Sequence, residues 1–370
     1  MKLFQTALNG RGSGAACVVS YFDVLQGSVS LFESLAQNEE DSTQGTILRI
    51  ESPGEDHLVE RALIARGATG TSEISQASAL RMRADHGRVR FVGQWFAGYS
   101  LLLADIESTL SILPNVSVQN HPAAIQLLFD KPRCQAFLAE NGVATPPTLP
   151  TINDYQHLLE VMRQADCSRV FAKLANGSSA SGVVALNTNG ARPVAITTLE
   201  IVRRCGEPRF YNNLKLSRYD RERDLRDLFE FLCRQGVHVE RWLPKAAQAG
   251  RNFDLRVVTY CGKACHAVVR TSRSPMTNLH LGNRRGDLEE LKNALGKRWE
   301  MITALCEQAA AAFPNAQYVG WDVLVTPGFR SAYILEGNAF GDLLPGITYG
   351  GVTSYEFAIQ TAEYHRIRTG

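Results

Sequence analysis

Residues Tyr318–Asp342 read YVGWDVLVTPGFRSAYILEGNAFGD, and the rest of the chain is organised around this stretch. Two apolar, β-branched runs flank a Pro-Gly turn signal, and this pattern predicts a β-hairpin. Acidic residues are rare in such strands, yet Asp322 and Glu336 interrupt the two runs. If the loop is the five residues from Pro327 to Ser331, the antiparallel ladder places the two acids directly opposite each other on one face.

The paired acids predict a metal site. Asn338 follows Glu336 by two residues, which puts both side chains on the same face of an extended chain. Opposed carboxylates repel, so the arrangement is favourable mainly when a cation lies between them. Asp322, Glu336 and Asn338 form a small all-oxygen set, which suits Mg²⁺ bound together with a phosphate. The alternative is an exposed hairpin face that carries a chance pair of acids.

Size and composition describe an ordinary globular protein. The chain has 370 residues, enough for two or three domains, and 45% apolar with 21% charged residues is the usual balance. A net charge of +2 gives no general attraction to nucleic acid. No apolar run reaches membrane-spanning length, and residues 1–14 lack the apolar segment of a secretory signal. Eight scattered cysteines favour reduced thiols, so we expect a cytoplasmic protein.

Short apolar runs, ACVVSYFDVL and TILRIES, precede amphipathic helical patterns in residues 1–120, which argues for an α/β unit. The turn Ser52-Pro53-Gly54 is expected to be a structural helix start, with contact to a substrate as the alternative. Two groups of arginines would suit either a solvated face or an anionic substrate. They are Arg81, Arg83, Arg88 and Arg90, and Arg270, Arg273, Arg284 and Arg285.

Two lysines stand beside segments that could hold a phosphate. Lys131 lies in a helical pattern next to Pro132, which should kink the helix or start a second one. Residues 169–183 predict a strand that ends at Lys173, followed by the small-residue loop Asn176–Gly182 and a return strand. Backbone N–H groups of such a loop can approach a phosphate closely, although the lysine precedes the glycines, unlike in a P-loop.

A second hairpin is predicted for NFDLRVVTYCGKACHAVVR, residues 252–270. With the three-residue turn Cys261–Lys263, Asp254 pairs with Arg270, and Arg256 points to the same face. A two-residue turn would send Arg270 to the opposite face, because a one-residue slip flips every side chain. We predict the three-residue turn, with both arginines facing the metal hairpin. A simple salt bridge is the alternative.

Two further segments have plainer patterns. Residues 190–234 are polar and charged and end in a helix, DRERDLRDLFEFLCR, with an exposed face. GDLEELKNALGKRWEMITALCEQAAAAF predicts one long amphipathic helix.

Taken in order, these features resemble the ATP-grasp superfamily, and the likeness covers about residues 120–360. Its specificity comes from five features in sequence. They are Lys131 before a helix, Lys173 before a Gly/Ser loop, an ExxL segment at Glu240–Leu243, a DxR strand at Asp254 and Arg256, and a final D…ExN at Asp322, Glu336 and Asn338.

The resemblance implies an α/β chain in which an N-terminal α/β domain precedes a two-lobed ATP-grasp fold with α+β lobes. The domains would be residues 1–120, then a central lobe of residues 121–243 with a lid loop, then a C-terminal lobe of residues 244–370 with the metal hairpin.

The resemblance also implies ATP and Mg²⁺, with two ions, as cofactors. Adenine would lie between the lobes, beside the hinge Glu240, Arg241, Trp242 and Leu243. Phosphate contacts would come from Lys131, Lys173 and the lid residues Ser178, Ser179 and Gly182. Asn278 resembles the family's asparagine near the metals. Arg256 and Arg270 would be the catalytic cations.

Two function classes remain open. The first is an ATP-dependent ligase that converts a substrate carboxylate into an acyl phosphate, which an amine or a thiol then displaces. The second is an ATP-binding module, or a phosphotransferase, without ligase chemistry. Two departures from the family favour the second class: no ribose-binding acid is evident in Pro244–Gly250, and residues 1–120 match no known substrate domain. The expected partners are a small-molecule or peptide substrate and a second copy in a homodimer, with no membrane and no nucleic acid.

Overall fold

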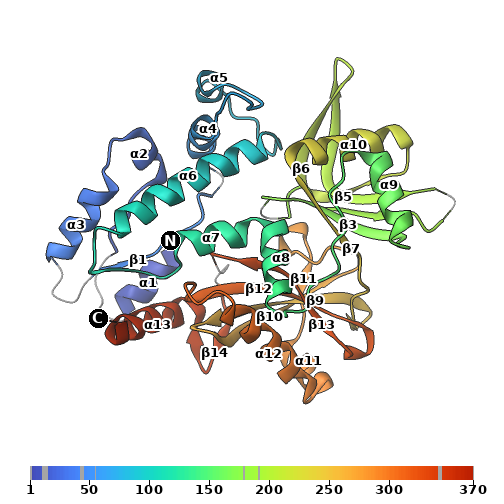
Figure 1. The fold of residues 1–370 in the computed structure, drawn as a ribbon. Coiled ribbons are helices and arrows are strands. Elements are labelled where there is room, and N and C mark those ends of the chain that lie inside the picture. Colours follow the sequence, from blue (N-terminus) through green and yellow to red (C-terminus); the bar gives the residue numbers. More distant parts are fainter. Residues whose placement is uncertain are drawn as a thin grey trace.

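The computed structural model describes residues 2–10, 16–41, 46–54, 56–177, 180–190, 192–340 and 344–369. Helices and strands are mixed throughout, so the predicted α/β class is confirmed. The blue N-terminal part, the green and yellow central lobe and the orange and red C-terminal lobe lie side by side (Figure 1). Within the described ranges, no helix is both long and apolar enough to cross a membrane.

The N-terminal part is mostly helical around a small parallel pair of strands, β1 and β2. Within the apolar run at residues 16–25, the second half forms part of a short helix, which Ser20 caps by accepting from the backbone of Phe22 and Asp23. The elements are α1 (Lys2–Gly10), α2 (Tyr21–Gln26), α3 (Leu31–Asp41), β1 (Thr46–Leu48), α4 (His57–Arg66), α5 (Gln76–Leu80), α6 (Val92–Leu110) and β2 (Val116–Val118).

The central lobe is a five-stranded antiparallel sheet in the order β6-β5-β4-β3-β7. Helices α9 (Tyr155–Gln164) and α10 (Glu222–Gln235) cover one face, where Leu158 and Leu228 join a closed apolar core. The strands are β3 (Arg169–Leu174), β4 (Val184–Asn187), β5 (Val194–Arg204), β6 (Glu207–Tyr219) and β7 (Val237–Arg241). The long β5–β6 hairpin, which the sequence pattern did not predict, projects from the molecule in Figure 1.

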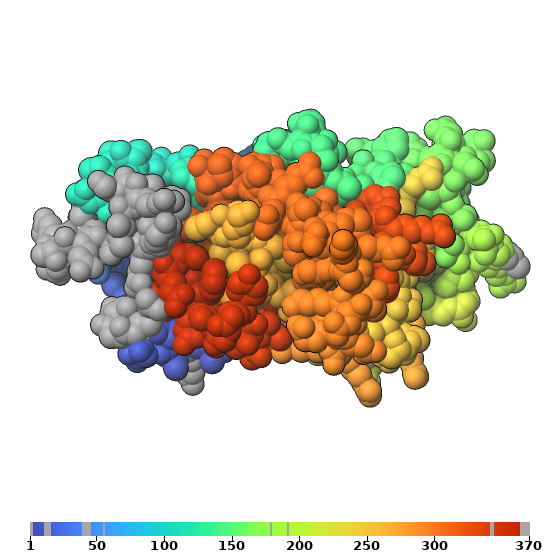
Figure 2. Space-filling view, turned by 90° about the horizontal axis from the view of Figure 1, so that it is seen from below, coloured from blue at the N-terminus to red at the C-terminus, as the bar shows by residue number. Residues whose placement is uncertain are grey.

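The C-terminal lobe is built on a second sheet, in the order β11-β10-β9-β12-β13, with β8 beside β9. Its strands are β8 (Ala247–Gln248), β9 (Arg251–Tyr260), β10 (Lys263–Ser272), β11 (Arg284–Arg285), β12 (Tyr318–Val325) and β13 (Ala332–Asn338). The single long helix expected after residue 285 is two helices, α11 (Leu288–Leu295) and α12 (Arg298–Ala311). Gly296, at φ 54° and ψ −130°, ends the first helix. Figure 2 shows this region, in orange, on the outside of the lobe.

Alternation along the central strands of this sheet separates a core face from a polar face. Leu255 and Val323 pack into the core with Ile302 of α12, whereas Asp254 and Asp322, one position away, face the opposite side. The helices α7 (Pro122–Phe129) and α8 (Lys131–Glu140) join the same core. The new start at Lys131 confirms that Pro132 begins a second helix. Helix α13 (Ser354–Thr369) and the small hairpin of β14 (Thr348–Tyr349) and β15 (Val352–Thr353) complete the lobe.

Candidate functional site

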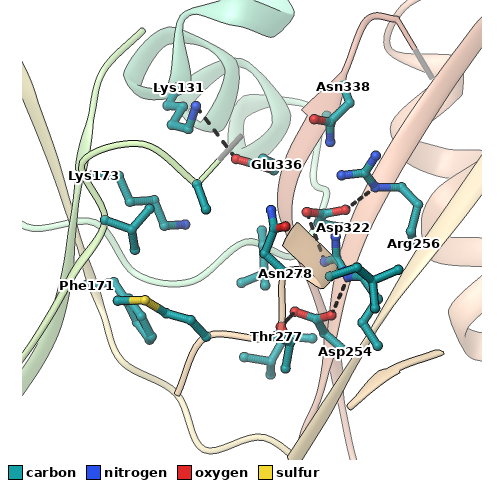
Figure 3. Close-up of a pocket in the computed structure, with 18 of the residues that line it drawn as sticks. Lys131, Phe171, Lys173, Asp254, Arg256, Thr277, Asn278, Asp322, Glu336 and Asn338 are labelled. Atoms are coloured by element: carbon teal, nitrogen blue, oxygen red, sulfur yellow. Dashed lines mark hydrogen bonds and ion pairs between the residues drawn. The ribbon is translucent and has the colours of Figure 1, made fainter. Parts of the chain in front are cut away.

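A cavity of about 630 Å³ lies between the two sheets and receives side chains from both lobes (Figure 3). Among its lining residues, positive charges outnumber negative ones by seven to four, which favours an anionic ligand. The cations are Lys131, Lys173, Arg241, Lys245, Arg256, Arg270 and Arg285, and the carboxylates are Glu240, Asp254, Asp322 and Glu336. Ser52, from the N-terminal part, also lines the cavity.

The β12–β13 hairpin brings Asp322 opposite Glu336, as predicted. The predicted loop length, however, is wrong. The strands close at Val325 and Ala332, so the loop has six residues and not five. A β-bulge at Leu335 adds one residue to β13 between the loop and Glu336, and this restores the register that a five-residue loop would have given.

The β9–β10 hairpin has the same kind of compensation. Asp254 pairs with Arg270, as predicted, but the turn contains two residues and not three, because Lys263 pairs with Tyr260. Cys261 and Gly262 both have positive φ, at 46° and 80°, which a two-residue type I′ turn requires. An extra residue between Ala264 and Ala267 then shifts the register by one, so that Arg270 reaches the cavity face after all.

On this face, two arginines hold Asp322. Arg256, its partner on the neighbouring strand β9, donates from Nε to Asp322 Oδ1, and Arg270 Nη2 lies 3.0 Å from Oδ2. All three side chains are less than a tenth exposed. Burial alone would raise the pKa of Asp322, but the two guanidinium groups hold that pKa well below its usual range.

The ion pairs continue through Asp254 to a lysine. Arg270 Nε donates to Asp254 Oδ1 at 2.8 Å, and Lys245 Nζ lies 2.9 Å from Asp254 Oδ2. Thr277 also donates its hydroxyl to this carboxylate. Although burial acts to raise the pKa of Asp254, Arg270 and Lys245 lower it. The result is a buried chain of three cations and two carboxylates, which fixes the arginines in place before any ligand arrives.

The opposite wall carries the two predicted lysines. Lys173 Nζ lies 2.5 Å from Glu240 Oε1, and both side chains are buried. Burial acts to raise the pKa of Glu240, but the ammonium of Lys173 is the largest opposing cause, and the pKa falls to about 2. Lys131 donates to the carbonyl of Gly177, in the lid loop, and its Nζ lies 3.7 Å from Glu336 (Figure 3).

The segment predicted as the adenine-reading hinge is only partly available. Arg241 and Leu243 line the cavity, but Trp242 does not and packs against Phe171 with ring centroids 5.2 Å apart. The backbone N–H groups of Arg241 and Trp242 donate to the carbonyls of Pro147 and Arg169. Glu240 faces the cavity but is held by Lys173, so its role in this structure is to orient that lysine.

The lid loop lies between β3 and β4, as expected for the tip of a hairpin. Gly177, Ala180 and Ser181 line the cavity, whereas Ser178 and Ser179 lie outside the described residues. Gly182 is not part of the lining. Its φ is 67°, and an added Cβ would lie 2.3 Å from Leu174 Cδ1, so this glycine serves the close packing of the loop.

Three further candidates line the cavity near the β12–β13 hairpin. Asn338 donates from Nδ2 to the carbonyl of Gly320 at 3.0 Å, which leaves its amide oxygen as the atom suited to a cation. The Glu336 side chain is 29% exposed, and its carboxylate faces Lys131. Asn278 caps a short 3₁₀ turn, η1 (Leu279–Leu281), by accepting from the backbone of His280.

Three contributors were not recognised in the sequence. Lys245 follows Pro244 in a loop, and Thr277 lies in a loop after β10, so neither position carried a pattern. Gln135 lies on a helix face, where a glutamine is normally solvated. It is 3% exposed and donates to Glu240. No repeat, spacing or charge pattern in the sequence marks these three residues.

Several solved structures that match this chain are ATP-grasp ligases. One is PsnB in complex with its minimal precursor, Mg and ADP, at 16% identity, covering 74% of this chain and 69% of that chain, with a TM-score of 0.40. The D-alanine–D-alanine ligase of Bacillus anthracis with ATP matches at 13% identity over 72% and 76%, with a TM-score of 0.45. The N5-carboxyaminoimidazole synthase of Aspergillus clavatus matches at 12% identity over 87% and 77%, with a TM-score of 0.47.

The chain is similar to these ligase and synthase structures. At these identities and TM-scores, the similarity carries no weight for the activity, substrate or cofactors of this chain. No protein-family model and no curated protein matches the chain.

Proposed function

We propose that the protein is an ATP-dependent ligase that activates a substrate carboxylate as an acyl phosphate for attack by an amine or a thiol. The observation that carries the proposal is the cavity between the two sheets. Lys131 and Lys173 lie on one wall, and the carboxylates and arginines of the C-terminal sheet lie on the opposite wall (Figure 3). A triphosphate needs cations on more than one side, and this arrangement supplies them.

The oxygen donors fit a magnesium ion that is shared with phosphate. Glu336 and the amide oxygen of Asn338 are accessible from the cavity, whereas both oxygens of Asp322 are engaged by arginines. Among the described residues, no three acidic, histidine or cysteine side chains form a metal cluster. Mg²⁺ often has only one or two carboxylate ligands, with phosphate and water completing its shell. The two arginines already compensate the negative charge of Asp322, so it would attract such an ion less than a free carboxylate does.

The side chains of this chain have separable tasks in the proposed reaction. Lys131 and Lys173 would bind phosphate oxygens. Arg256 and Arg270, already fixed by Asp322 and Asp254, would stabilise charge on the phosphoryl group as a carboxylate oxygen bonds to the γ-phosphorus and ADP leaves. The amine or thiol would then bond to the acyl carbon, and inorganic phosphate would leave. Mg²⁺, when bound, would neutralise phosphate charge.

Binding and turnover test the proposal separately. MgATP should bind to the purified chain with a dissociation constant in the micromolar to millimolar range, which is typical of enzyme substrates. ADP should be released only when a suitable carboxylate and amine are supplied, for example as pools of amino acids and short peptides. Lys173→Met should abolish nucleotide binding, while Lys263→Met, at a lysine that is 77% exposed outside the cavity, should not. A chain that does not bind MgATP refutes the proposal.

One observation favours the second class, an ATP-binding module without ligase chemistry. Asp322 is paired with two arginines, which compensate its charge and weaken its attraction for a metal ion. In that case MgATP binds but no pool stimulates ADP release. Acyl hydroxamate formation in the presence of hydroxylamine distinguishes the two classes, because hydroxylamine traps an acyl phosphate.

A further inference from the structure

Gln135 contacts both walls of the cavity through a single nitrogen atom. It lies on α8 and is 3% exposed. Its Nε2 donates to Glu240 Oε2 at 2.8 Å and to the backbone carbonyl of Leu335 at 3.2 Å. Because both partners are acceptors, only the NH₂ group can face them, and the orientation of the amide is fixed.

The bond to Leu335 supports the bulge that positions a candidate metal ligand. Leu335 is the extra residue of β13, between Ile334 and Glu336. In the described part of the chain, β13 is an edge strand that pairs only with β12, and Gln135 donates to the carbonyl of Leu335 from α8. Without the bulge, Glu336 would lose its place opposite Asp322, because one residue of slip reverses the faces. Gln135 therefore holds the backbone at the residue before Glu336.

The bond to Glu240 fixes the other wall. Glu240 Oε1 lies 2.5 Å from Lys173 Nζ, and the second oxygen accepts from Gln135. A carboxylate that is hydrogen-bonded at one oxygen only can rotate. The bond from Gln135 prevents this rotation of Glu240, and Glu240 in turn orients the ammonium of Lys173. His238 Nε2 lies 3.6 Å from the same oxygen, too far for a good hydrogen bond.

We propose that Gln135 is a positioning residue that couples the two walls of the cavity, aligning Lys173 through Glu240 and Glu336 through the bulge at Leu335. The nature of the ligand rests on the proposed function, but the coupling itself does not. Among uncharged side chains, only a primary amide supplies two N–H groups from one nitrogen atom. A methionine fills the space without a donor, and a glutamate donates one bond only when it is protonated.

The coupling can be measured without any ligand by hydrogen exchange. In Gln135→Met, exchange should accelerate about tenfold in two separate peptides, one that covers Ala332–Asn338 and one that covers Val237–Arg241, because each loses a hydrogen bond from a buried group. The peptide of β10, which does not pair with β13, serves as the internal reference and should stay protected. Acceleration in only one of the two peptides, or in all peptides equally, would overturn the coupling.

A pH profile separates positioning from a simple loss of packing. In Gln135→Glu, burial and the nearby Glu240 should raise the pKa of the new carboxyl. It then stays protonated, and restores the bond to Glu240, up to a higher pH than an exposed glutamate does, and once ionised it repels that carboxylate. The dissociation constant of MgATP should therefore rise about tenfold from pH 6 to pH 8 relative to wild type. In Gln135→Met the weakening should be the same at both pH values.

Gln308 provides a matched control, since it is an exposed glutamine that donates to the carbonyl of Gly142. Gln308→Glu should bind MgATP like wild type at both pH values. If the wild type binds MgATP and the dissociation constant of Gln135→Glu does not change with pH, the proposal is overturned. If the wild type itself does not bind MgATP, the proposed function fails, and the exchange experiment alone decides the coupling.

Discussion

Replacing Asp322 by asparagine removes the negative charge that Arg256 and Arg270 share. The exchange keeps the volume of the side chain, so on the hairpin sequence alone it would leave the fold intact. The structure predicts otherwise, because all three side chains are less than a tenth exposed and both carboxylate oxygens are in ion pairs. Removing one partner of a buried ion pair leaves uncompensated charge and costs about 3–5 kcal/mol.

This cost should be visible in thermal unfolding. At about 2 °C per kcal/mol for a large domain, the unfolding temperature of Asp322→Asn should fall by roughly 6–10 °C. Asp220→Asn is the matched control, because its ion pair with Arg218 is 3.8 Å long and both side chains are about half exposed or more. The control should unfold within about 1 °C of wild type. If Asp322→Asn also unfolds at the wild-type temperature, the buried ion chain does not hold the arginines.

Three further outcomes are expected. Because the pKa of Glu240 is about 2, its pairing with Lys173 stabilises the fold above the unfolded value of about 4.3 and is lost as the pH falls towards 2. In urea unfolding, the free energy of unfolding of Glu240→Gln should fall less between pH 7 and pH 3 than that of wild type. An equal fall in both proteins would contradict this. Exchange in the peptide Asn176–Gly182 should slow when MgATP is added, and unchanged exchange would indicate an ordinary surface loop. Gly337→Ala should destabilise the hairpin and weaken MgATP binding, because the added Cβ would lie 2.6 Å from Trp321. Stability and MgATP binding both equal to wild type would contradict that packing.

Much of the cavity could be predicted from the sequence because charge stands out in apolar strands. Asp322 and Asp254 interrupt runs that are otherwise buried, and such acids need partners. The β5–β6 hairpin was missed because threonines and charged residues interrupt the apolar residues of β5, and β6 is mostly polar, so neither strand shows a clear alternation. Lys245 and Gln135 were missed for a different reason, since each acts on a partner that is distant in sequence, and no local pattern reports a tertiary contact.

The two hairpins show why the predicted register can be correct although the predicted turn length is wrong. Side-chain alternation constrains which residues must share the buried polar face, and in both hairpins the chain meets that constraint. Turn geometry is a separate, local constraint: the Cys261–Gly262 turn is fixed by positive φ at both residues, and the loop after Val325 has its own closing bonds. A bulge reconciles the two constraints by adding one residue, so the sequence specifies the facing residues more strongly than it specifies the loop. This also explains why the bulge at Leu335 is tied to a buried side chain: a register restored by one extra residue depends on that residue staying in place, and Gln135 is the group that holds it.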